Sequence, residues 1–300
     1  MTRISRDQLT YAFDATIPPV ATIRSGDTIT VETHDTSTGR IHQASDVTGF
    51  IAARDPKKVN PAAGPIFVDG AEPGDTLDVE ILAIRLGPIG FARLLRNAGV
   101  LQNELEPDGI AMVETDGDAL IFAGKVRYPA RPMVGVVGVA PAEGTVYTAH
   151  PAAIGSNADF NAVTTGTVVH LPVQVPGALL AIGDLHASMG DGEVCGTGVE
   201  ISGEVDARVT LHKGGAPERI WLETAEDWIQ TGQGETIELA VQEGVEMMTR
   251  FLMRQLDLSR TEAFLLVSAR GDVRIGQAAA IPGCDATVYV RFPKAVERLR

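Results

Sequence analysis

Residues 27–35, DTITVETHD, and residues 74–84, GDTLDVEILAI, alternate apolar and polar side chains along the chain. A period of two is typical of a β-strand with one buried face. Residues 124–141, 166–187 and 200–212 continue the pattern, and glycine or proline recurs between them at about ten-residue intervals. The sequence therefore predicts a mainly β fold whose body resembles a sandwich or barrel.

The pattern changes after about residue 222. Residues 235–256, ETIELAVQEGVEMMTRFLMRQL, place apolar side chains at helical spacing, so we expect a long helix over roughly residues 237–256. Gly244 lowers helix propensity by up to about 1 kcal/mol, so close packing is expected there. Ser259 and Glu262 form a capping-box pattern for a second, short helix, and strands return in residues 271–293.

Two parts follow from this change of pattern. We expect a β-rich body over residues 1–222, which carries most of the site, and an α/β segment over residues 223–300 packed on it. A chain of 300 residues suits one large domain or two closely joined ones, so the two parts could also form one domain.

The composition indicates which partners the protein could bind and in which cellular compartment it works. A net charge of −14 repels phosphate backbones and argues against nucleic acid and anionic membranes. No stretch approaches the roughly 18 apolar residues that span a bilayer, and the N-terminal residues lack the apolar run of a secretory signal. Cys195 and Cys284 are therefore expected to be free thiols. The sequence predicts a cytoplasmic protein.

The densest polar cluster lies in residues 183–200, GDLHASMGDGEVCGTGVE. Asp184 and His186 are two residues apart, so on a strand they project from the same face. Asp191 and Glu193 repeat that spacing. A carboxylate and an imidazole on one face suit a divalent metal, and the alternative is an Asp–His pair that fixes a turn.

Other polar segments are weaker signals. Asp35 follows a strand in residues 32–42, a position where sites tend to be built, although it could equally cap its own turn. Asn157 and Asn60 lie beside glycine or proline in ordinary turn sequences. We find no G-x-S-x-G, H-E-x-x-H or strand-following G-x-G-x-x-G motif, and Cys195 fits a small buried residue better than a nucleophile.

Taken together, these segments resemble the acetamidase/formamidase family. The resemblance extends from about residue 30 to the end, and residues 183–200 are its most specific part. It implies a β-sandwich-like body with an α/β segment near the C-terminus, usually in an oligomer, and hydrolysis of formamide, acetamide or related short amides. The segments that carry it include ETHDTSTGRI (32–41), NPAAGPIFVDGAEPGDTLDVEIL (60–82), GSNADF (155–160), GDLHASMGDGEVCGTGVE (183–200) and SARGDVRIGQ (268–277).

The resemblance also implies which residues meet in the site. These are Asp35, Asn157, Asp184, His186 and Glu193. The sequence departs from the family motifs at Ser156, where a second glycine is usual, and at Arg40, where glutamine is common. An arginine near the pocket would select a different amide, even one that carries a carboxylate.

Amide hydrolysis needs an activated water, stabilisation of the oxyanion and a proton for the leaving nitrogen. A divalent metal supplies the first two, and we expect zinc, held by Asp35, Asp184 and His186. We expect Glu193 to act as the base, with His186 sharing the acid–base work if no metal is present.

We expect Asn157 and Arg40 to contact a small amide substrate, in a chain that forms a homo-oligomer. The alternatives are a lactamase or other C–N hydrolase on the same scaffold, and a non-catalytic β protein that binds a small molecule.

Overall fold

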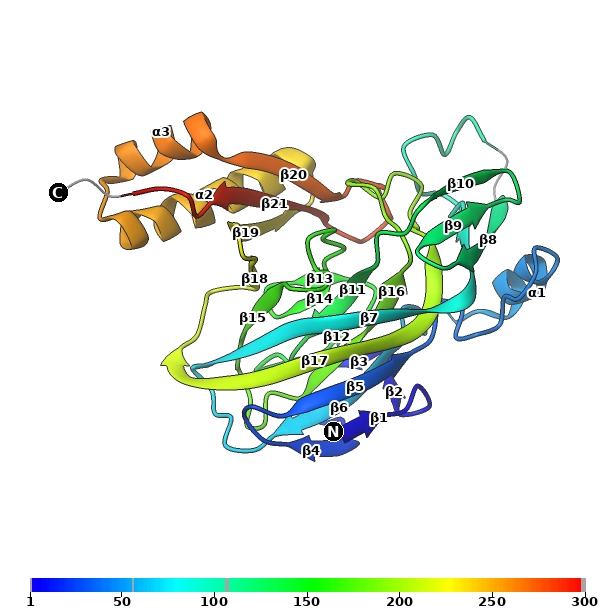
Figure 1. The fold of residues 1–300 in the computed structure, drawn as a ribbon, viewed down its shortest axis with the longest axis horizontal. Coiled ribbons are helices and arrows are strands. Elements are labelled where there is room, and N and C mark those ends of the chain that lie inside the picture. Colours follow the sequence, from blue (N-terminus) through cyan, green and yellow to red (C-terminus); the bar gives the residue numbers. More distant parts are fainter. Residues whose placement is uncertain (1, 56, 106–107, 298–300) are drawn as a thin grey trace.

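The computed structural model describes residues 2–55, 57–105 and 108–297. Their strands form one curled 19-stranded sheet and a separate two-stranded ribbon (Figure 1). The pairings are antiparallel except for two, β1 (Thr2–Ile4) with β5 (Thr28–Thr33) and β4 (Ala21–Ile23) with β6 (Ala62–Val68). The prediction of a mainly β fold is confirmed, and the strand pairings of that fold are largely antiparallel.

The body is built on its two longest strands, β7 (Asp75–Arg93) and β17 (Glu200–Gly215), which pair with each other. Between Asp75 and Ile81, buried and half-buried residues alternate, as the sequence predicts. The remaining strands of the body are β2 (Leu9–Thr10), β3 (Ala12–Phe13), β8 (Ile110–Asp116), β9 (Ala119–Phe122), β10 (Val126–Pro129), β11 (Met133–Gly138), β12 (Val146–Tyr147), β13 (Pro151–Ala152), β14 (Gly155–Asn157), β15 (Val168–Pro172), β16 (Leu180–His186) and β18 (Trp221–Glu223).

The C-terminal segment adds three strands and two helices. The strands are β19 (Asp227–Gly234), β20 (Asp272–Gln277) and β21 (Ala286–Pro293). The helix α2 (Ile237–Leu256) has the predicted bounds, and the predicted capping box opens α3 (Arg260–Arg270). Both helices pack on these strands around a small core of their own, so the predicted α/β segment is confirmed (Figure 1).

One helix is absent from the sequence prediction. The helix α1 (Asp46–Ala53) has eight residues, of which only Val47 and Phe50 are buried. These two side chains pack with Phe91 of β7 in a small separate cluster. Two apolar contacts within eight residues give too short a periodicity to be recognised as a helix.

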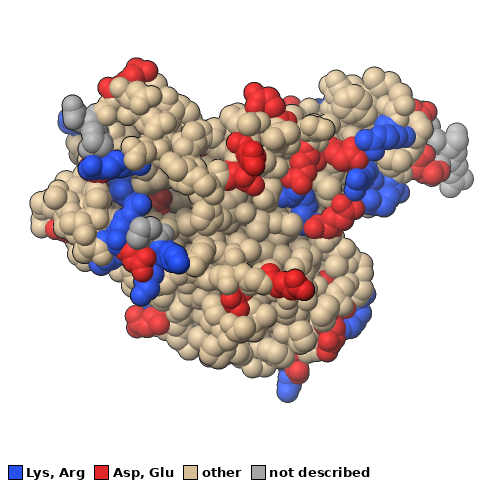
Figure 2. All heavy atoms as spheres, turned by 180° about the vertical axis from the view of Figure 1, so that it is seen from behind, with Lys and Arg blue, Asp and Glu red and all other residues tan. Residues whose placement is uncertain are grey.

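The surface carries charges of both signs. On the face shown in Figure 2, acidic and basic side chains are interspersed with uncharged ones. No described helix is long and apolar enough to cross a bilayer. Cys195 and Cys284 are free thiols, as expected.

Candidate functional site

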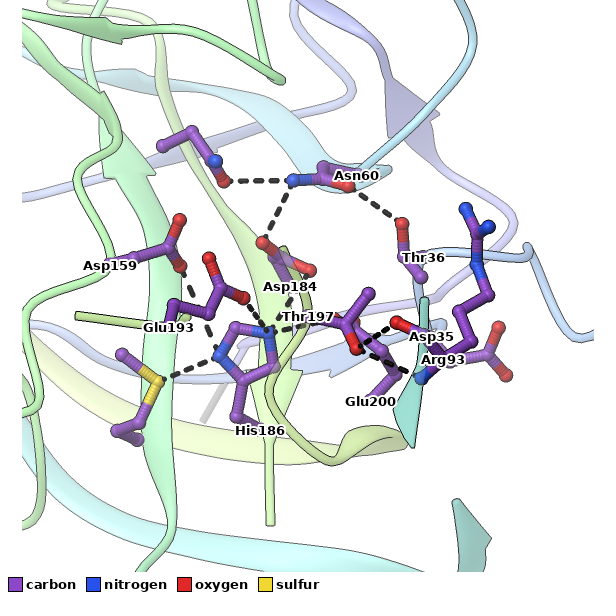
Figure 3. Close-up of polar contacts among 12 residues, drawn as sticks. Asp35, Thr36, Asn60, Arg93, Asp159, Asp184, His186, Glu193, Thr197 and Glu200 are labelled. Carbon is purple, nitrogen blue, oxygen red and sulfur yellow. Dashed lines mark hydrogen bonds and ion pairs between the residues drawn. The ribbon is translucent and has the colours of Figure 1, made fainter. Parts of the chain in front are cut away.

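A buried imidazole lies among carboxylates at the end of β16. The Nε2 atom of His186 lies 3.1 Å from Oε1 of Glu200. It also lies 3.9 Å from carboxylate oxygens of Asp184 and Glu193. The Nδ1 atom of His186 lies 3.9 Å from Oδ1 of Asp159 (Figure 3). All five side chains are buried, so the body contains a cluster of ionisable groups with little contact with bulk solvent.

Neighbouring strands and their loops position this cluster. Asp184 and His186 lie on β16 and turn to the same side, as their two-residue spacing predicts. Glu200 begins β17 and pairs in register with His186. Asp159 follows β14, and Glu193 lies in the loop between β16 and β17. The cluster therefore forms only when these segments are brought together.

Three of the carboxylates sit on strained backbone. Asp159, Asp184 and Glu193 have φ of 48°, 56° and 39°, in a region that non-glycine residues rarely adopt. Gly135 of β11 makes room for two of them, because a Cβ there would lie 2.5 Å from Asp159 Oδ1 and 2.8 Å from Asp184 Oδ2. Strain held in place by the surrounding fold is typical of functional sites.

Gln277, at the end of β20, orients two carboxylates at once. Its Nε2 donates to Oδ2 of Asp159 at 3.1 Å and to Oε2 of Glu193 at 3.0 Å. The C-terminal segment thus contributes directly to the cluster. Because each of these carboxylates keeps its other oxygen free of Gln277, both can still act on a ligand.

Asn60 orients one carboxylate and one amide. Its Nδ2 donates to Oδ2 of Asp184 at 3.0 Å and to Oδ1 of Asn157 at 2.8 Å. The hydroxyl of Thr36 donates to Oδ1 of Asn60 at 2.7 Å and fixes the orientation of that amide (Figure 3). With its oxygen occupied, Asn157 keeps its own N–H groups available.

Burial and mutual repulsion control the protonation of the cluster. Burial is the main reason why the pKa values of Asp159 and Asp184 are raised well above the usual range, and neighbouring carboxylates add to it. Burial also raises the pKa of Glu193, against the attraction of His186. For His186, burial favours the neutral imidazole, but Glu200 and Asp184 outweigh it and raise the pKa well above normal.

The donor set fits a divalent cation. Among the described residues, Oδ1 of Asp159, Oδ1 of Asp184 and Oε2 of Glu200 are buried without a hydrogen-bond partner. Two sets, Asp159–His186–Glu193 and Asp184–His186–Glu200, each bring their ligand atoms within 4.8 Å of one another. Carboxylate oxygens with one imidazole nitrogen suit zinc and similar ions, and a cation would relieve the crowding of negative charge.

A cavity of about 310 Å³ opens onto the cluster. Its wall includes Asp184 and Glu193 from the cluster, and Asn157 beside them. Two basic side chains, Arg54 and Arg93, also line it. A volume of this size suits a small molecule.

Two of the residues expected in the site make their contacts elsewhere. Oδ1 of Asp35 accepts hydrogen bonds from the backbone N–H groups of Ser37 at 2.7 Å and Gly39 at 3.3 Å, within its own loop. Asp35 belongs to neither ligand set. Nε of Arg40 donates to the Ser37 carbonyl at 2.8 Å, its guanidinium lies over the Phe50 ring, and it does not line the cavity.

Comparison with known proteins identifies the family. A sequence profile described as "Acetamidase/Formamidase family" matches residues 5–149 and 142–296, which together cover nearly the whole chain. The chain belongs to the acetamidase/formamidase family. An acetamidase from Mycolicibacterium smegmatis is 28% identical to it over 266 residues, which cover 66% of this chain and 64% of that protein. The chain spans just under two thirds of the length of the curated family members it matches.

Solved structures of family members agree with the fold. An acetamidase from Bacillus halodurans is 34% identical, with a TM-score of 0.90 over 97% of each chain. A protein from Thermoanaerobacter tengcongensis, described as a predicted acetamidase/formamidase, is 36% identical, with a TM-score of 0.91 over 97% of this chain and 95% of its own. The curled β architecture is therefore that of the family.

Several residues of this site were not identified from the sequence. Glu200, Asp159 and Gln277 were not assigned a role, and Asn60 was interpreted as part of a turn. Each of these lies inside or at the end of a segment that carries the family resemblance, and that position is the signal which could have identified them. Arg93 lies outside every such segment, and only the structure reveals it.

Proposed function

We propose that this protein hydrolyses a short amide to the carboxylate and ammonia. The observation that carries the proposal is Glu193, a buried carboxylate with a raised pKa that lines the cavity beside His186. A base whose pKa lies closer to the working pH transfers protons more efficiently than an ordinary glutamate. Membership of the family and the names of its relatives support the same reaction.

Glu193 would serve twice in each turnover. Its carboxylate accepts a proton from the attacking water while the new C–O bond forms. The resulting carboxyl group then donates that proton to the amide nitrogen as the C–N bond breaks, so ammonia leaves and a carboxylic acid forms. The acid then loses its remaining proton to water or to ammonia and becomes the carboxylate. Gln277 holds the other oxygen of Glu193 and keeps the reacting one turned toward His186.

Asn157 would bind the amide. Its Oδ1 is occupied by Asn60, so its Nδ2 is the group left to donate to a substrate carbonyl oxygen in the cavity. A donor fixed in advance stabilises the negative charge that develops on this oxygen. Arg40, our other substrate-binding candidate, would act only if its loop moved toward the cavity.

We propose that Asp184, His186 and Glu200 hold a divalent cation, with zinc the leading choice. Such an ion, when bound, acidifies a water and polarises a carbonyl. The free oxygens of Asp184 and Glu200 support this assignment, and it leaves Glu193 free to act as the base. Asp35 has its hydrogen bonds inside its own loop, so Glu200 replaces it in our ligand set.

Ammonia release from formamide, acetamide and propionamide, together with ring opening of a lactam measured by its amino acid product, tests the proposed function. The protein would be stripped of metal and then reconstituted with zinc, manganese or cobalt. We expect turnover of at least one linear amide by a reconstituted form. Turnover of the lactam alone would point to a lactamase, and binding of amides without ammonia release by any form would point to a non-catalytic binding protein.

Three further expectations remain proposals. We propose that the chain works as a homo-oligomer, and the exposed Phe264 and Leu265 on α3 offer an apolar surface for a second copy. Light scattering after size-exclusion chromatography tests this. We also propose a cytoplasmic location, which the free thiols support, and a boundary near residue 222, which limited proteolysis tests.

A further inference from the structure

Arg93, the last residue of β7, is a buried cation without an anionic partner. It is 5% exposed, and its Nε atom is buried with no hydrogen-bond partner among the described residues. No described carboxylate lies within ion-pair distance of its guanidinium, which Glu200 and Asp108 attract only from farther away. The guanidinium lies over the Phe50 ring, 5.5 Å from the ring centre. The backbone N–H and carbonyl of Arg93 are both bound by the Thr197 hydroxyl, so the residue is anchored.

Another deeply buried arginine among the described residues behaves differently. Arg219 is 6% exposed and forms an ion pair with Glu243, with further hydrogen bonds to Thr231 and Gln233. This is the usual arrangement, because an unpaired buried charge is strongly unfavourable. Arg93 therefore lacks the partner that the fold supplies to an arginine with a purely structural role.

The surroundings of Arg93 indicate where such a partner would lie. Arg93 and Arg54 line the same cavity as Glu193 and Asn157. Burial, and then the charge of Arg54, lower the pKa of Arg93, so an anion between the two arginines would stabilise both. The charge of Glu200 raises the pKa of Arg93 from a distance, but no carboxylate of the cluster forms an ion pair with it.

We propose that Arg93, assisted by Arg54, binds a carboxylate group on the substrate, so that the preferred substrate is a short amide that also carries a carboxylate. This inference rests on the proposed amide hydrolysis and names its substrate class. A guanidinium presents parallel N–H groups that match a carboxylate in a bidentate fashion. The substrate would then span the cavity, with its carboxylate at Arg93 and its amide at Asn157 and Glu193.

The test compares two substrates of matched length. Succinamate carries an amide and a carboxylate, and butyramide replaces the carboxylate with a methyl group. We expect kcat/KM for succinamate to exceed that for butyramide by about tenfold or more, given the strength of hydrogen bonds between charged groups. Malonamate and propionamide form a second, shorter pair.

Variants then assign that preference to Arg93. In Arg93→Gln the ratio of kcat/KM for succinamate to butyramide should fall by about 10- to 100-fold, and Arg93→Lys should recover part of it. The matched control is Arg208→Gln. Arg208 is an exposed arginine of β17 that lies well along the strand from Glu200 and forms an ion pair with Glu80 of β7. Its substrate ratio should stay that of the parent.

Each outcome decides the inference. The inference is wrong if the parent prefers butyramide, or if Arg93→Gln loses activity on succinamate and butyramide equally, because Arg93 would then not bind the substrate carboxylate. If no amide is hydrolysed, the proposed function fails. The carboxylate site is then tested separately, by measuring the binding of succinamate and butyramide with calorimetry. Tighter binding of succinamate that is lost in Arg93→Gln supports the carboxylate site, and equal binding contradicts it.

Discussion

Amide side chains hold three of the carboxylates around His186, and the imidazole itself contacts the fourth, Glu200. Gln277 donates two hydrogen bonds to carboxylates of the cluster, and Asn60 donates one to Asp184 and a second to Asn157. An arginine or lysine in the same places would pair with the carboxylates and lower their pKa values. Neutral amides orient the same oxygens without supplying positive charge. The carboxylates therefore keep their raised pKa values, and a bound cation would still stabilise them.

Glu193→Gln tests the base directly. The isostere still accepts a hydrogen bond from Gln277, so stability should change little, while kcat should fall by about 100-fold or more because the proton acceptor is gone. The parent should also lose kcat/KM as pH falls through the raised pKa of Glu193, since the base must be ionised. Steady-state kinetics across pH measures both effects.

The control for this variant is Glu238→Gln, which changes an exposed carboxylate in the first turn of α2. Its pH profile and kcat should match the parent. If Glu193→Gln retained activity within a few-fold of the parent, Glu193 would not be the base.

Cys284 offers a prediction about reactivity. Burial, aided by the nearby Asp159 and Asp285, raises the pKa of its thiol to about 11. At neutral pH we therefore expect alkylation by iodoacetamide in a Cys195→Ser background to be about 10- to 100-fold slower in the folded protein than in denaturant. Mass spectrometry of labelled peptides measures the rates. Equal rates in the two states would show that the thiol is not protected.

Sequence reasoning at this scale reached only part of the site. The spacing of Asp184 and His186 places them on one strand face, and that can be read from the sequence alone. The unpaired guanidinium of Arg93 cannot, because nothing local distinguishes it from the paired Arg219. Whether a charge has a partner depends on contacts across the fold.

At the level of elements, α2 lies unusually close to β19 at a pair of glycines. A Cβ on Gly232 of β19 would lie 2.2 Å from the carbonyl oxygen of Ala240 and 2.4 Å from the nitrogen of Gly244. The close packing expected at Gly244 is therefore confirmed. Both of these are backbone atoms, so neither can avoid an added Cβ by a change of side-chain rotamer.

Gly232→Ala should lower the free energy of unfolding by about 1–3 kcal/mol or more, because helix and strand must separate. The control is Gly49→Ala in α1, where an added Cβ meets no atom within 4 Å. That change should be neutral or stabilise by up to about 1 kcal/mol through helix propensity. Urea unfolding of both variants measures the difference. Equal stabilities would show that the contact between α2 and β19 relaxes freely.

The elements divide clearly into those that sequence predicts and those that it does not. The bounds of α2 follow from a regular apolar period over twenty residues, and the start of α3 follows from its capping box. The pairing of β7 with β17 joins segments more than a hundred residues apart, and no local pattern specifies it. Strand pairing determines the composition of the site, because the register places Glu200 opposite His186, and spacing along the sequence did not reveal this contact.

On the scale of the whole molecule, the cluster ties distant segments together. Asp184 and His186 come from β16, Glu200 from β17, and Gln277 reaches in from the C-terminal segment. Without a cation, their packing brings like charges together in a buried place, which opposes folding. A bound ion would therefore act on the stability of the entire fold as well as on catalysis.

We expect zinc or another divalent ion to raise the free energy of unfolding, by about 2.7 kcal/mol at a free concentration one hundred times its Kd. Asp184→Asn should abolish this increment, because it removes a ligand charge while keeping the shape of the side chain. Asp191→Asn should retain it, since Asp191 lies in the same loop as Glu193 but bonds to Tyr289 outside the cluster. Thermal melts with zinc and with manganese show whether any divalent ion stabilises the protein and which ion does so more. Chelation should abolish turnover, and added metal should restore it. Full activity in protein that elemental analysis finds metal-free, together with melting that no divalent ion shifts, would refute the metal site and leave Glu193 and His186 to carry the acid–base chemistry unaided.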